Sequence, residues 1–148
     1  MSPRWLLPLL GAALMVAWWA GARLNAPTAQ RLAPDSSCDL ALGPCSLPLP
    51  GGGQVSLALA PRPPRVMIPL SLSVDLAGSA TAVWVDFVGL NMEMGFNRAE
   101  LAAAPGGLWQ GRIILPICTA AEMQWEARVY IQQDQVRIEA PFAFTTRP

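Results

Sequence analysis

The chain has 148 residues, with ten basic and ten acidic side chains and no histidine. A formal net charge of zero without a basic stripe argues against nucleic-acid binding, because a nucleic-acid-binding surface must neutralise phosphates. Without histidine the commonest general base is missing, and a cysteine nucleophile would need an activating base or cation, so we expect no enzyme.

An uncharged, apolar run from Trp5 to Ala22 is the first predicted element. Its 18 residues are enough for a tight transmembrane helix, and tryptophans stand at both of its ends, as they do at membrane interfaces. We therefore predict a retained membrane anchor over residues 1–23. A removed signal peptide is the alternative, because residues 20–22 (Ala-Gly-Ala) resemble a cleavage site of small residues.

A small, polar, proline-containing stretch at residues 24–35 follows the anchor and is typical of a linker. The remainder, residues 36–148, is long enough for one domain. Cys38 and Cys45 lie close together in the sequence, and an oxidising compartment allows such a pair to bridge. We therefore predict a single-pass protein of the bacterial inner membrane whose domain lies in the periplasm.

Apolar residues alternate with polar or small ones within residues 36–148, and glycine- and proline-rich turns separate the runs. This period of two is typical of strands with one face in a core. We predict an all-β domain, an immunoglobulin-like β-sandwich of about seven strands. Residues 97–104 are predicted as one short helical turn that Asn97 caps. The alternating runs are 55–59, 68–76, 83–87, 109–115, 123–131 and 136–144.

Three cysteines leave at least one of them unpaired. Cys38 and Cys45 are the disulfide candidates, since Gly43-Pro44 between them can turn the chain back into bonding range. Two alternatives stay open: Cys118 pairs with one of them, or Cys38 and Cys45 remain a dithiol that binds Cu(I). Outside a disulfide, Cys118 is either a buried thiol or a metal contact.

Sulfur side chains form the candidate metal site, which consists of Met92, Met94, Cys118 and Met123. Thioether and thiolate ligands without imidazole favour Cu(I), so Cu(I) is the expected cofactor. In a strand, Met92 and Met94 would share one face and stand about 7 Å apart. The alternative is that these methionines fill irregular gaps in the core.

Four short segments carry a resemblance to a known family: 69–72 (PLSL), 85–95 (VDFVGLNMEMG), 107–111 (GLWQG) and 115–116 (LP). With the single anchor and the linker, they make the chain similar to the FixH/YtkA-like family of small membrane-anchored periplasmic proteins. Members often show a Met-x-Met element before a glycine, which only Met92 and Met94 match here. Cys118, Met123 and the Cys38/Cys45 pair lie outside the family pattern. The resemblance implies a role in copper supply or cytochrome oxidase assembly.

These patterns together predict a membrane-tethered periplasmic accessory protein that handles Cu(I) in cytochrome oxidase assembly. Its expected partner is an inner-membrane protein complex, such as a haem-copper oxidase or its assembly factors. The alternative is a ligand-free interaction module that docks on a membrane protein, with Met92, Met94 and Phe96 forming an apolar patch.

Overall fold

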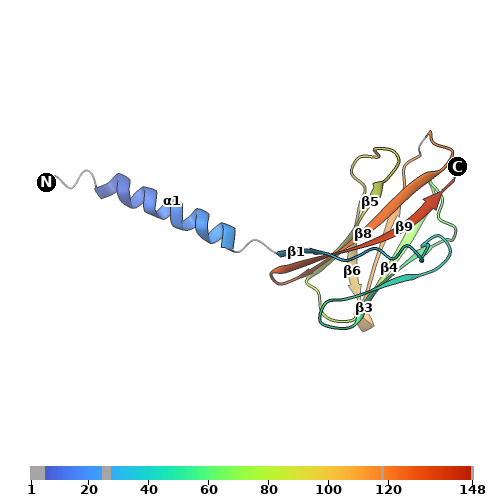
Figure 1. Cartoon of the computed structure of the whole chain (residues 1–148), viewed down its shortest axis with the longest axis horizontal. Coiled ribbons are helices and arrows are strands. Elements are labelled where there is room, and N and C mark those ends of the chain that lie inside the picture. The colour runs from blue at the N-terminus through green and yellow to red at the C-terminus, as the bar shows by residue number, and fades with distance from the viewer. Residues whose placement is uncertain (1–5, 25–27, 118, 148) are drawn as a thin grey trace.

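A computed structural model describes residues 6–24, 28–117 and 119–147 of the chain. These residues form one α-helix, one short 3₁₀ helix and nine strands (Figure 1). In chain order the elements are α1 (Leu6–Leu24), β1 (Thr28–Arg31), β2 (Cys45–Pro48), β3 (Gln54–Ala60), β4 (Pro69–Leu76), β5 (Ala82–Gly89), β6 (Arg98–Ala104), η2 (Pro105–Gly107), β7 (Leu108–Ile114), β8 (Met123–Gln133) and β9 (Val136–Thr146).

The helix α1 covers most of the predicted anchor and projects from the sheet as a separate element (Figure 1). Its apolar side chains at Leu14, Val16 and Trp18 are exposed rather than packed in a core. Across the described part of the chain, no helix is both long and apolar enough to cross a membrane. The membrane anchor therefore stays a prediction.

The nine strands form one curled sheet in the order β1-β9-β8-β5-β6-β7-β4-β3-β2. The bend lies at β6, whose first half (98–101) pairs with β5 and whose second half (102–104) pairs with β7. All pairings are antiparallel except β1 with β9. The prediction of an all-β domain is confirmed, with nine strands among the described residues instead of about seven.

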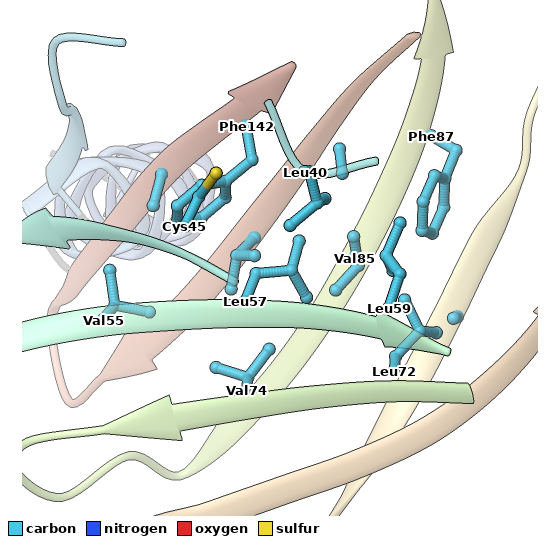
Figure 2. Close-up of a cluster of buried hydrophobic side chains, with 14 of the residues drawn as sticks. Leu40, Cys45, Val55, Leu57, Leu59, Leu72, Val74, Val85, Phe87 and Phe142 are labelled. Atoms are coloured by element: carbon cyan, nitrogen blue, oxygen red, sulfur yellow. The ribbon is translucent and has the colours of Figure 1, made fainter. Parts of the chain in front are cut away.

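One hydrophobic core lies inside the curl and collects the inward side chains of both halves of the sheet. Buried and more exposed residues alternate along the strands. In β3, for example, Val55, Leu57 and Leu59 are buried while their neighbours are not. Figure 2 shows part of this core, where side chains from β3, β4, β5 and β9 gather with Leu40. Each fully buried aliphatic side chain of this kind stabilises the fold by roughly 1.5–3 kcal/mol relative to leaving it exposed.

The prediction of a helical turn at residues 97–104 is wrong, because this segment is β6. Ala99 and Leu101 point into the core, so the segment has a period of two that the neighbouring alanines mask. A strand here hydrogen-bonds to a neighbour on either side, which an isolated helical turn cannot do. Gly111 permits this pairing, since a Cβ at that position would overlap Leu101 and stand 2.9 Å from the Glu100 carbonyl oxygen.

Part of the predicted linker, residues 24–35, belongs to the sheet. The four exposed residues of β1 run parallel to β9, with Thr28 opposite Val136 and Arg31 opposite Glu139. Arg31 donates hydrogen bonds to both Glu139 and Glu126, the latter at 3.0 Å. The strand is therefore supported by backbone pairing with β9 and by a long-range ion-pair network rather than by apolar burial, and its sequence has no alternation that could have predicted it.

The domain has two ends, which the strand register defines. The proximal end holds the tight turns 49–53, 77–81, 105–107 and 134–135 and the start of β1. The distal end holds the longer segments 38–44, 61–68, 90–97 and 115–122, together with the strand ends that they join. Residue 118, in the last of these segments, is not described. The 11 residues of β8 run from one end to the other, a length of about 36 Å at 3.3 Å per residue.

Candidate functional site at the distal end

Exposed apolar side chains are concentrated at the distal end. Seven large apolar residues there are 44–83 % exposed, whereas on the rest of the described domain only Val136 belongs to this class, at 38 %. The proximal turns consist mainly of glycine, proline, alanine and small polar residues. The two ends therefore differ in chemistry as well as in loop length. The seven residues are Leu42, Met67, Ile68, Leu90, Phe96, Ile114 and Ile117.

The segment 90–97 is an ordered loop that is fixed to the sheet at several points. The side chain of Asn91 donates to the Glu122 carbonyl oxygen at 2.9 Å and accepts from the Gln124 backbone N–H at 3.0 Å. Further along, the side chain of Asn97 donates to the Met94 carbonyl oxygen at 2.9 Å. The Asn91 bonds hold the start of the loop against β8, and the Asn97 bond lies within the loop and fixes its second half, so the exposed residues project from a defined backbone.

Phe96 is held in place despite being 76 % exposed. The guanidinium carbon of Arg98 lies 4.9 Å from the centre of the Phe96 ring and 5.3 Å from that of Trp84. Arg98 also donates two hydrogen bonds to the carboxylate of Asp86, at 2.6 and 2.7 Å. The hydrogen bond from Arg98 to Asp86 raises the pKa of Arg98, so the cation that supports the ring is permanent.

The predicted sulfur site is assembled only in part. Met94 and Met123 both pack against Gly89: a Cβ there would overlap the methyl carbon of Met123 and stand 2.9 Å from Cγ of Met94. Met92 lies in the same loop, half-buried against the core, and its carbonyl oxygen also abuts Gly89. Cys118, the fourth predicted ligand, lies outside the described residues.

One detail of the sulfur prediction is wrong. Met92 and Met94 do not share a strand face, because β5 ends at Gly89 and both methionines are in the loop beyond it. Met123 is fully buried at the start of β8, so its thioether is a core group in this structure. The side chains of Met94 and Met123 both reach Gly89, and thioethers are the donor type that suits a soft ion. Within the described residues, no three His, Cys, Asp or Glu side chains lie together as a metal site.

The predicted disulfide between Cys38 and Cys45 is present, with the two Cα atoms 5.9 Å apart. It excludes both the pairing of either residue with Cys118 and the dithiol alternative. The bond closes segment 38–44, in which Leu40 is fully buried and Leu42 is 83 % exposed. A hydrogen bond from the Leu40 N–H to the Ala143 carbonyl oxygen, at 3.1 Å, ties the same segment to β9.

Sequence reasoning identified Phe96 as part of an apolar surface but missed the other six exposed residues. Four of these six are apolar residues at the edge of an alternating run or in the connection between two runs, namely Met67, Ile68, Leu90 and Ile117. Leu42 precedes the first run, and Ile114 is an outward position within the run 109–115. A comparison of the chain with family models, with characterised proteins and with solved structures gives no match.

Proposed function

We propose that this protein is a membrane-tethered accessory protein whose distal end docks on a partner protein of the same membrane. The observation that carries the proposal is the concentration of exposed apolar side chains at one end of the domain. Exposed apolar side chains gathered at one end of a small domain favour an interaction site, because their exposure to water is unfavourable until a partner covers them.

The tether and the compartment follow from the anchor proposal. The uncharged run from Trp5 to Ala22 and the exposed apolar face of α1 support a membrane anchor. The chain enters the sheet at the proximal end, so the distal end would stand about 36 Å from the point of attachment, the length of β8. The Cys38–Cys45 disulfide supports an oxidising compartment, and we place the domain in the bacterial periplasm.

We also propose that the curled sheet is an immunoglobulin-like β-sandwich. The change of pairing partner within β6, from β5 to β7, supports two packed halves joined by one shared strand. This architecture suits docking, because loops gather at the ends of a sandwich while the strands keep them in fixed positions. Three of the four distal segments are fixed in this way. The disulfide closes segment 38–44, Asn91 ties the 90–97 loop to Glu122, and Arg98 binds Asp86 at the end of that loop. Less entropy is therefore lost when a partner binds.

The docking proposal is tested with apolar-to-serine variants of the full chain. A tagged Phe96→Ser/Ile117→Ser variant and a Val136→Ser variant are expressed at equal levels and purified from native membranes in mild detergent. We expect a membrane protein that co-purifies with the wild type to be lost with the first variant and retained with the second. Co-purification of the same proteins with both variants would contradict the proposal.

Copper(I) handling in oxidase assembly is the second candidate. One observation favours it: Met94 and Met123 meet at Gly89, and Met92 lies in the same loop. If a soft ion binds there, these thioethers are the donors, and Met123, which is fully buried, must become accessible to the ion. The loose family resemblance of the Met-x-Met element points to the same role, with a haem-copper oxidase or its assembly factors as partner.

The copper candidate is tested by titrating the full chain, with its Cys38–Cys45 disulfide intact and oxygen excluded, with Cu(I) against a competing chelator. We expect Met92→Leu/Met94→Leu to abolish binding and Met67→Leu, which alters an exposed methionine in another loop, to leave it unchanged. Equal Cu(I) affinity in both variants would remove Met92 and Met94 as ligands and leave the docking function alone.

A further inference from the structure

A groove of about 540 Å³ lies on the outer face of the sheet, across β3, β4 and β7. The strand register places two rows of outward residues along its floor, and Pro44 and Arg62 border it. On β3 and β4 every outward residue of these rows is alanine or serine, so the floor lies close to the backbone. The rows are Ala60–Ser71–Arg112 and Ala58–Ser73–Gln110.

The two arginines at this groove are not neutralised. Neither Arg62 nor Arg112 has a carboxylate within 4.0 Å among the residues that the structure describes. Among the other described arginines of the domain, Arg65 and Arg137 also have no carboxylate within 4.0 Å, whereas four form ion pairs: Arg31, Arg98, Arg128 and Arg147. Of the described residues that line the groove, none is acidic. The groove therefore carries unopposed positive charge at its distal edge.

The opposite outer face of the sheet, over β5, β8 and β9, is covered by large side chains around Trp84. Trp84 stacks on Tyr130 with ring centres 5.4 Å apart, and Arg137 lies 5.3 Å from the centre of the Trp84 ring. Arg128 and Glu126 neutralise each other on the same face. Large side chains cover that face as strand propensity favours, whereas alanine and serine leave the groove face bare.

We infer that this groove binds an acidic, extended segment of the docked partner protein, with its carboxylates between Arg62 and Arg112. Arginine is suited to this ligand because its planar guanidinium binds a carboxylate through two parallel hydrogen bonds. Ser71, Ser73 and Gln110 offer further polar groups to the backbone of an extended chain.

The position of the groove favours a segment of the docked partner over an unrelated ligand. Arg62 belongs to segment 61–68 of the distal end, which also exposes Met67 and Ile68, so the groove opens onto the proposed docking surface. Asp75 is the outward residue of β4 nearest the proximal end. Its carboxylate repels acidic groups and so limits the anionic part of the partner segment to the distal edge of the groove. This inference rests on the docking function and adds the chemistry of one partner segment to it.

The test uses the full chain in detergent and a fluorescently labelled peptide of alternating glutamate and serine. Fluorescence anisotropy should show binding that weakens with salt, and no binding of the matching lysine–serine peptide. We expect Arg62→Ala/Arg112→Ala to weaken binding about tenfold or more, equal to about 1.4 kcal/mol. Arg65→Ala/Arg137→Ala removes the same charge elsewhere and should leave the affinity within about twofold of the wild type.

A second variant tests the groove without changing its charge. Ala58→Tyr fills the floor with a residue that strands favour, so the protein folds and peptide binding is lost. Equal peptide affinity in Arg62→Ala/Arg112→Ala and the wild type would overturn the inference, as would full displacement of the peptide by an equal concentration of inorganic phosphate. Phe96→Ser, which alters the distal docking surface, should leave the affinity for the peptide unchanged. Peptide binding therefore tests the groove alone, and co-purification with the Phe96→Ser/Ile117→Ser variant tests the docking surface alone.

Discussion

Met94 and Met123 meet at the unsubstituted Cα of Gly89, although they come from a loop and from the first residue of β8. This contact joins the end of β5, the 90–97 loop and the start of β8 at one point of the distal end. The methionines therefore have a structural role whether or not they also bind a metal ion, since flexible thioethers fill irregular gaps in a core.

Gly89→Ala should destabilise the protein by about 1–3 kcal/mol, because the added methyl group overpacks a site that is already filled. The new Cβ would overlap both the side chain of Met123 and the backbone carbonyl of Met92, so a simple rotamer change cannot relieve it. Gly43→Ala is the control, since a Cβ there meets no atom within 4 Å. Chemical denaturation measures both; equal midpoints for the two variants would refute the packing account.

Arg31→Ala should release β1 from the sheet. Arg31 is the one side chain of β1 for which hydrogen bonds to β8 and β9 are described, through Glu126 and Glu139. The Leu32 N–H, which donates to the Glu139 carbonyl oxygen at 2.8 Å, should exchange with deuterium about tenfold faster. Arg65→Ala is the control. Unchanged exchange at Leu32 would show that the backbone pairing of β1 and β9 is sufficient by itself.

Acid should weaken the same network through Glu126. Burial opposes its ionisation, but hydrogen bonds from Arg128 and Arg31 outweigh burial and hold the pKa of Glu126 below its ordinary value of 4.5. Because the folded pKa is the lower one, the stability from this carboxylate is complete above pH 4.5 and disappears as the pH falls through the folded value.

Glu126→Gln should therefore lower the free energy of unfolding by about 0.5–1 kcal/mol at neutral pH, a value that allows for solvent screening of these partly exposed ion pairs, and flatten its fall below pH 4.5. The control is Asp75→Asn, an exposed carboxylate on β4. Denaturant titrations between neutral pH and pH 3 provide the measurement. An unaltered pH profile in Glu126→Gln would contradict the assigned role of this residue.

The Cys38–Cys45 disulfide determines how many cysteines react with a thiol reagent, and it also contributes to stability. The unfolded, unreduced protein should react with one equivalent of thiol reagent, at Cys118, and the reduced protein with three. Cys38→Ala/Cys45→Ala should lower the free energy of unfolding by about 2 kcal/mol, because the closed loop is short. Three reactive thiols before reduction would mean that the bond does not form.

The sequence predicted the six long strands well, because alternation of apolar and polar residues reports directly on which face is buried. It could not predict β1, whose four residues are all exposed and which depends on Arg31 meeting acids more than ninety positions away. It also mistook β6 for helix, since Ala102 to Ala104 favour helices locally while the pairing with β5 and β7 decides the outcome.

The candidate site was harder to predict than the strands for a similar physical reason. The disulfide was found because its two cysteines are close in sequence, so local turn residues report on it. The distal surface combines residues from four segments, such as Leu42, Met67, Phe96 and Ile117, and only the register of the whole sheet brings these segments to one end. For Met123, its place in an alternating run indicated burial, which the structure confirms.

Site-specific photo-cross-linking in cells tests the docking function most directly. A photoreactive amino acid replaces Phe96 at the distal end, or Val136 at the proximal end as the matched exposed position. The account predicts a discrete adduct with a membrane protein from position 96, lost in an Ile117→Ser background, and none from position 136. Adducts of the same kind and yield from both positions, or from position 136 alone, would contradict it.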